Sequence, residues 1–294
     1  MIVIIGCIVV IGSVLGGFSM AGGHVHALIH PSEIVTIGGS ALGALIMMSS
    51  KKVLVDLVKS MLAAVKGSPF NKDMYTELFK LMYEIARLMR RSGLLALESH
   101  LNDPHNSELF KKYPRICRSH HVLTFICDGF TPLIEGSISE PDKLRSLLDA
   151  EIAVMEEEHH LAIGALQKTA DGLPGFGIVA AVLGIVITMG AIDGPVEEIG
   201  HKVGAALVGT FLGILMSYGF FGPLAARMEL LGAAEAAFFR TIANIIVACA
   251  DSCVPRVIIE QARRGVGTEF RPARNQLESL FKEAEVEGTE PAAA

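Results

Sequence analysis

The sequence lacks the motifs on which most enzymes depend: it has no phosphate-binding loop, no nucleophile elbow and no zinc-binding signature. It also lacks charge over two long stretches, because Leu173–Ile192 and Val203–Ala226 contain no Asp, Glu, Lys, Arg or His. Each stretch is long enough to cross the roughly 30 Å hydrocarbon core of a bilayer as a helix. With 51% apolar residues and a mean hydropathy of +0.48, the chain is predicted to be a membrane protein and not an enzyme.

Two further spans are predicted at the start of the chain, at Met1–Gly23 and Ile34–Ser50. The first has no basic n-region and no small-residue cleavage pattern, so we expect a retained span and not a signal peptide. It also contains Gly12-Ser-Val-Leu-Gly16, a spacing that lets membrane helices pack closely. Four membrane-spanning helices follow from these patterns.

The distribution of basic residues predicts the orientation of these spans. The link at Ala21–Glu33 has no Lys or Arg, and the link between the last two spans has only Lys202. The region Lys51–Ala170 carries 16 Lys and Arg, and the part after the fourth span carries 8. Because cytoplasmic loops carry the excess of basic residues, both basic regions and both termini are predicted to be cytoplasmic.

The predicted organisation is an all-α membrane protein with long cytoplasmic helical extensions. Residues 1–50 form a first hairpin with a short periplasmic link, and 51–170 form a cytoplasmic helical domain. Residues 171–226 form the second hairpin, and 227–294 form a C-terminal cytoplasmic helix with a disordered tail from Gly288. Acids and bases balance in 51–170, with 16 of each, so the net charge of −6 does not indicate nucleic-acid binding.

The predicted cytoplasmic segments have helical spacing and no strand-like alternation. Asp73–Arg91 places apolar residues on one helical face, and Gly93 interrupts that pattern. A second helix is predicted to begin near Ser139–Asp142 and to continue into the third span with a break at Gly172–Pro174. A third is predicted from Arg227 to about Arg264.

Small residues recur at four-residue spacing in the last two spans, as in Gly177-Ile-Val-Ala-Ala181 and Gly209-Thr-Phe-Leu-Gly213. Such faces let helix backbones approach closely in lipid. Two interpretations follow. The faces pack against each other within the chain, or they serve oligomerisation or the docking of a foreign helix.

The predicted spans contain no titratable acid, base or histidine that could bind a transported proton. If the protein moves ions, the titrating group must come from another chain. The hydroxyls of Thr188 and Thr210 remain, although a threonine in a helix often bonds to its own backbone. Pro174 and Pro223 sit at the same end of their spans, and at matching depth they would form a pair of hinges.

A possible metal site occurs at Glu156–His160, which contains Glu-x-x-His spacing. No second motif of this kind accompanies it, so a solvated helix face is predicted and no metal or cofactor is expected.

The last two spans, together with their flanks, resemble the MotA family of flagellar motor stator subunits. The resemblance is carried by DGLPGFGIVAAVLG at Asp171–Gly184 and by VGTFLGILMSYGFFGPLA at Val208–Ala225. It extends over nearly the whole chain through Gly16–Gly23, Pro31–Glu33, Met89–Glu98 and Tyr113–Ile116.

The resemblance implies an assembly in the bacterial inner membrane. Five such subunits form a homo-oligomeric ring around the membrane helices of two MotB chains. MotB supplies the aspartate that takes up the ion and anchors the complex to peptidoglycan. Ion flow then turns the ring against the rotor protein FliG.

The resemblance also implies roles for individual residues. Pro174 and Pro223 match the two functional prolines of the family, and Thr210 matches the threonine that faces the ion path. Arg90 and Glu98 match the charged pair that engages the rotor. From spacing alone these two would share a helical face only if Gly93 left the helix intact, and they would otherwise be an ordinary solvated surface.

The coupling ion is predicted from Ala181, where sodium-driven relatives carry a threonine. A methyl group gives a metal cation no oxygen ligand, so protons are favoured over sodium. Two alternatives remain open. The chain could be an energiser of outer-membrane processes of the ExbB or TolQ type, although those relatives have three spans, or it could be a helical membrane scaffold that conducts nothing.

Overall fold

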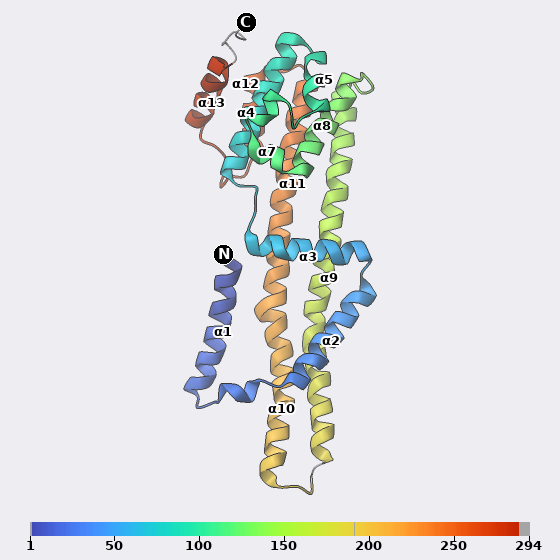
Figure 1. Ribbon diagram of the computed structural model, residues 1–294, viewed down its shortest axis with the longest axis vertical. Helices are drawn as coiled ribbons and strands as arrows, with labels where there is room; N and C mark the ends of the chain where they lie inside the picture. The colour runs from blue at the N-terminus through green and yellow to red at the C-terminus, as the bar shows by residue number, and fades with distance from the viewer. Residues whose placement is uncertain (1, 191, 288–294) are drawn as a thin grey trace. The chain divides into compact units, whose positions relative to one another are not determined.

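The computed structural model describes residues 2–190 and 192–287, and within them every regular element is helical (Figure 1). The elements in chain order are α1 (Ile2–Met20), the 3₁₀ helix η1 (Val25–Leu28), α2 (Pro31–Met48), α3 (Lys51–Lys66), α4 (Lys72–Ser92), α5 (Leu95–Asn102), α6 (Glu108–Lys111), α7 (Pro114–Arg118), α8 (His120–Ile134), α9 (Pro141–Met189), α10 (Val196–Ile214), the π-helix η2 (Leu215–Phe221), α11 (Gly222–Ala250), α12 (Pro255–Gly265) and α13 (Arg274–Glu287). The predicted disordered tail, Gly288–Ala294, lies outside the described residues.

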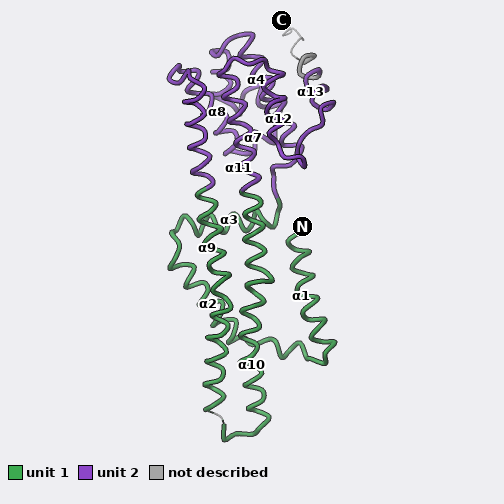
Figure 2. Tube along the Cα trace, turned by 180° about the vertical axis from the view of Figure 1, so that it is seen from behind, with its two compact units in different colours: residues 1–67, 157–232 green, residues 68–156, 233–294 purple. Residues whose placement is uncertain are grey.

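The chain forms two compact units that alternate along the sequence (Figure 2). Unit 1 comprises residues 1–67 and 157–232, and unit 2 comprises residues 68–156 and 233–294. The helices α9 and α11 each have residues in both units.

Unit 1 contains the predicted spans. Four helical segments of the described chain are long and apolar enough to cross a membrane, and each overlaps one of the four predicted spans. The prediction of a break at Gly172–Pro174 is wrong, because α9 is one helix of 49 residues with Pro174 inside it. Proline removes only one hydrogen bond of the helix, and the bonds on either side hold α9 together.

The fourth span contains a π-helical segment. The π-helix η2 lies between α10 and α11, and its last turn is closed by a bond from the Gly222 N–H to the Ser217 carbonyl. Pro223 follows directly and has no N–H to donate to the carbonyl four residues earlier. The widened turn therefore accommodates the proline, and the kink predicted at Pro223 stays a prediction. Such π segments in helices often mark functional positions.

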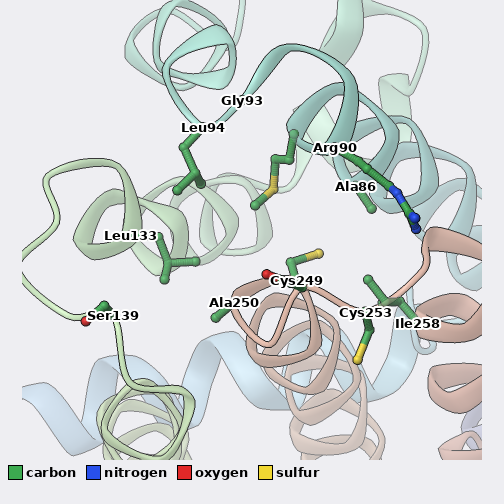
Figure 3. Close-up of a pocket in the computed structure, with 12 residues that line it drawn as sticks. Ala86, Arg90, Gly93, Leu94, Leu133, Ser139, Cys249, Ala250, Cys253 and Ile258 are labelled. Carbon is green, nitrogen blue, oxygen red and sulfur yellow. The ribbon is translucent and has the colours of Figure 1, made fainter.

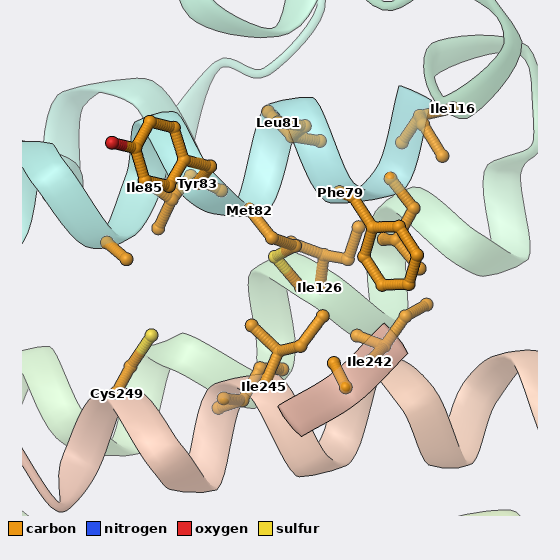
Figure 4. Close-up of a cluster of buried hydrophobic side chains, with 14 of the residues drawn as sticks. Phe79, Leu81, Met82, Tyr83, Ile85, Ile116, Ile126, Ile242, Ile245 and Cys249 are labelled. Carbon is orange, nitrogen blue, oxygen red and sulfur yellow. The ribbon is translucent and has the colours of Figure 1, made fainter. Parts of the chain in front are cut away.

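Unit 2 encloses a large apolar core (Figure 4). The face of α4 predicted from its spacing is buried, with Leu78, Leu81, Met82 and Ile85 almost fully enclosed. Gly93 ends α4 with a φ of +84°, a backbone conformation that glycine adopts without strain. The prediction that Gly93 interrupts this helix is therefore confirmed.

The α11 segment of unit 2 completes this core from the far end of the sequence. Phe238 lies between the rings of Phe70 and Tyr75, with centroids 5.0 and 4.9 Å away. The predicted helix from Arg227 to Arg264 is divided, because α11 ends at Ala250 and α12 begins at Pro255.

Candidate functional site

The backbones of α9 and α10 approach each other closely in unit 1. A methyl group added at Gly177 would lie 2.9 Å from the carbonyl oxygen of Gly209, and one added at Gly213 would lie 2.6 Å from that of Leu173. One at Gly184 would lie 2.7 Å from the Cβ of Ala206. The glycines therefore allow the two helices to pack backbone to backbone, and these small residues are used within the chain.

The same contacts fix the register of the hairpin and separate the two prolines. Gly177 meets Gly213 and Gly184 meets Ala206 in this antiparallel pair, so Pro174 lies level with about residue 216. Pro223 lies about 7 residues further along the helix, which is about 10 Å at 1.5 Å per residue. The prediction that the two prolines sit at matching depth is therefore wrong. The sequence prediction took equal distance from the ends of the two spans as equal depth. The contacts between α9 and α10 instead offset those ends along the helix axis.

The predicted ion-path residues lie along this hairpin. Pro174, Ala181 and Thr210 are half-buried, and Pro223 is exposed. The Thr188 hydroxyl donates to the Gly184 carbonyl at 2.7 Å, so it is satisfied by its own helix. Among the described residues the Thr210 hydroxyl has no such bond, which leaves a free polar group beside the α9–α10 contact.

One acidic residue near this contact was missed by sequence reasoning. Glu33 lies in the first turn of α2, and its side chain is buried against Gly209 of α10. The helix α2 begins at Pro31, before the predicted start of the second span at Ile34, so Glu33 is helical although it lies just outside that predicted span. The signal that could have found it was the proline itself, which favours the first turn of a helix.

The two predicted rotor-contact residues lie in unit 2, on either side of Gly93. Arg90 is in the last turn of α4 and Glu98 is in α5, so they do not share one helix. Both are exposed. Arg90 and Gly93 also line a cavity of about 530 Å³ with Cys249 and Cys253 (Figure 3). The structure keeps both charges on the surface and does not pair them.

The segment Glu156–His160 uses its acids in ion pairs. Glu156 accepts two bonds of 2.7 Å from Arg240 within unit 2, and Glu158 pairs with Lys52 within unit 1. These contacts match the predicted solvated helix face. No group of His, Cys, Asp and Glu able to hold a metal occurs among the described residues.

Fold and site together define an all-helical membrane protein built around a hairpin whose predicted spans carry no charge of their own. Two family models match the chain: that of the motility protein A N-terminal region over residues 4–93, and that of the MotA/TolQ/ExbB proton channel family over residues 123–241.

Curated relatives extend the match over nearly the full length. Motility protein A of Salmonella typhimurium is 35% identical, with 95% of this chain and 94% of the relative covered. The chemotaxis protein LafT of Vibrio parahaemolyticus is also 35% identical, over 96% and 98% of the two chains. The chain therefore belongs to the motility protein A (MotA) family.

Solved structures agree in fold. The chain is similar to one from the structure of C. jejuni MotAB, with a TM-score of 0.77 and 20% identity over 92% of this chain and 98% of that one. It is also similar to one from the flagellar MotAB stator complex of Bacillus subtilis, with a TM-score of 0.73 and 22% identity over 94% and 98%.

Proposed function

We propose that this chain is the stator subunit of a bacterial flagellar motor and forms a proton-conducting complex with a MotB-type partner. Membership in the MotA family is the observation that carries this proposal. The spans Leu173–Ile192 and Val203–Ala226 support it, because they carry no charge and a proton path through them needs an acid supplied by another chain. The similarity to MotAB complexes supports a MotB-type partner and association among copies of this chain.

The finer features of the assembly belong to the same proposal. Five copies form a ring in the inner membrane, with both termini and unit 2 in the cytoplasm, as the distribution of Lys and Arg favours. The ring turns against the rotor protein FliG, and Arg90 and Glu98 make the contact. Exposed charges suit this repeated contact, because electrostatic attraction speeds association more than it tightens binding.

Protons are the coupling ion in this proposal. Ala181 offers a methyl group where a sodium site needs an oxygen ligand. One proton that falls through about 150 mV delivers some 3 to 4 kcal/mol. Each step must therefore connect states of similar free energy, which a ring of equivalent subunits provides.

Complementation of motility tests the function directly. A strain that lacks its own motA and motB genes should swim when it carries this chain with the MotB-type partner, and it should not swim with either gene alone. The same strain should respond to the proton gradient and not to added sodium. Rescue of an outer-membrane energising defect without rescue of swimming would instead assign the chain to the ExbB or TolQ class.

A further inference from the structure

Glu33 has a buried carboxyl oxygen with no partner in the described chain. The residue is 7% exposed, and its Oε2 atom is shielded from solvent without a hydrogen bond. Buried carboxyl oxygens are normally hydrogen-bonded, so an unpaired one points to a group that the isolated chain does not supply.

The carboxyl occupies the space that a glycine leaves open. A methyl group at Gly209 would lie 2.5 Å from Oε2 of Glu33 and 3.1 Å from the Cβ of Ala180. The carboxyl group therefore rests on the backbone of α10 where α9 also meets it. Thr210 and Ala181, two of the residues predicted on the ion path, follow Gly209 and Ala180 directly in the sequence.

No positive charge of the neighbouring elements neutralises Glu33. The α9 segment Leu173–Met189 and the α10 segment Val203–Ile214 contain no titratable side chain. At the start of α10, Lys202 pairs with Glu198 at 2.8 Å, and His201 precedes it in the same turn.

The other titratable groups near this end of unit 1 include the acids Asp193 and Glu197 and the histidines that flank and form η1. His24 precedes η1, His26 lies within it, and the His30 ring nitrogen Nε2 lies 3.1 Å from the Ala27 carbonyl. An ionised carboxylate buried without a counter-charge is costly, and the N-terminus of α2 offsets only a small part of that cost.

We propose that Glu33 is a proton-binding carboxyl of the ion path, supplied by this chain in addition to the partner's acid. The inference rests on the proposed proton-conducting function. A proton from water or from the partner's carboxyl forms an O–H bond at Oε2 and neutralises Glu33, and its departure restores the carboxylate. Each subunit of a ring would then hold one exchangeable proton beside Ala181 and Thr210.

Proton flux through the complete complex tests the inference. The full-length chain and its MotB-type partner are reconstituted in vesicles, and dye-reported proton uptake is driven by a potassium diffusion potential. Glu33→Gln keeps the size of the side chain but cannot exchange a proton, and we expect flux to fall by about a hundredfold while the complex still assembles. The matched control is Glu197→Gln, which removes an exposed acid in the first turn of α10 and should leave flux unchanged.

The outcomes separate this inference from the proposed function. Flux in the wild-type complex and undiminished flux in Glu33→Gln would overturn the role of Glu33 alone. A wild-type complex that passes no protons would overturn the channel function, and the role of Glu33 would fall with it.

Chemical labelling gives a second readout that does not depend on the variant folding. Dicyclohexylcarbodiimide adds to protonated carboxyls in apolar surroundings, so the wild-type complex should gain mass on the peptide that contains Glu33. The labelling rate should rise as the pH is lowered, because the reactive form carries the proton. A Glu33 peptide that stays unlabelled at every pH while the complex conducts would refute the assignment.

Discussion

Gly213 is the residue at which the α9–α10 contact tolerates least change. A methyl group there would meet the Leu173 carbonyl oxygen at 2.6 Å, and a backbone atom cannot move aside as the tip of a side chain can. We expect Gly213→Ala to destabilise the protein by about 1–3 kcal/mol, the usual cost of overpacking. The measurement is the thermal unfolding midpoint of the purified chain in detergent.

Gly204→Ala is the matched control for this prediction. Gly204 lies in the same helix, and a methyl group there meets nothing within 4 Å. Because alanine is the better helix former, the control should be unchanged or more stable by up to about 1 kcal/mol. Equal unfolding midpoints for the two variants would refute the packing described for the hairpin.

The two charges at the end of α4 allow a test at single-residue resolution. Arg90 and Arg91 are adjacent, both exposed, and both in the last turn of the helix. If Arg90 contacts the rotor, Arg90→Glu should reduce swimming strongly, whereas Arg91→Glu should reduce it less. Neither change should alter the stability of unit 2 by more than about 1 kcal/mol, since exposed charges contribute little. Swimming speed in soft agar and thermal unfolding give the two readouts, and an Arg90→Glu strain that swims normally would remove Arg90 from the contact.

At the scale of the helix, each proline leaves one carbonyl without its usual partner. Alanine at position 174 would supply an N–H to Ala170, and alanine at 223 would supply one to Gly219, which favours straight α-helix over the η2 turn. We expect Pro174→Ala and Pro223→Ala to preserve assembly but to lower torque, measured as the rotation speed of tethered cells. Unchanged rotation in both variants would end the hinge hypothesis.

The separation of the prolines adds a second expectation. With about 10 Å between them along the helix axis, the changes in unfolding free energy of the two single variants should add in the double variant to within about 0.5 kcal/mol. A larger deviation would show that the two sites move together.

The sequence was sufficient to predict that the helices exist. It was not sufficient to predict at which residues they end or which residues of neighbouring helices lie level with each other. Hydropathy predicted the four spans, and periodicity predicted the buried face of α4, because both signals are averaged over many residues. The helix α2 begins three residues before the predicted second span, and Glu33 lies in that stretch, which was predicted to be part of the link. The depth of Pro174 relative to Pro223 depends on which small residues meet, and spacing within one helix does not reveal its partner.

The roles that the family resemblance gives to Arg90 and Glu98 also could not be predicted from helical spacing. The family resemblance assigned Arg90 and Glu98 to one function, and the structure shows why spacing could not. Gly93 lies between them with a positive φ and ends α4. The relative placement of Arg90 and Glu98 is therefore set by a turn and not by helical periodicity.

For the whole molecule, the core of unit 2 is the largest source of apolar burial that the structure describes. Phe238 is fully buried and contacts Phe70, Tyr75 and Phe239. We expect Phe238→Ala to cost about 3–5 kcal/mol, the range for deleting a buried aromatic ring. The exposed Val257→Ala on α12 is the control and should stay within about 0.5 kcal/mol of wild type. Protein recovered from membranes and its thermal unfolding would show the difference, and similar values for both variants would contradict the description of the core.

The alternation of the two units along the chain has a consequence for biosynthesis. Phe70 and Phe238, which touch in the finished protein, are separated by 168 positions, so at 5–20 residues per second the ribosome delivers the second roughly 8 to 34 s after the first. During that interval the apolar side of α4 has been translated but its partner has not. The nascent chain therefore exposes apolar surface of α4 for many seconds after its first hairpin has been translated, and such exposed surface favours aggregation until α11 emerges.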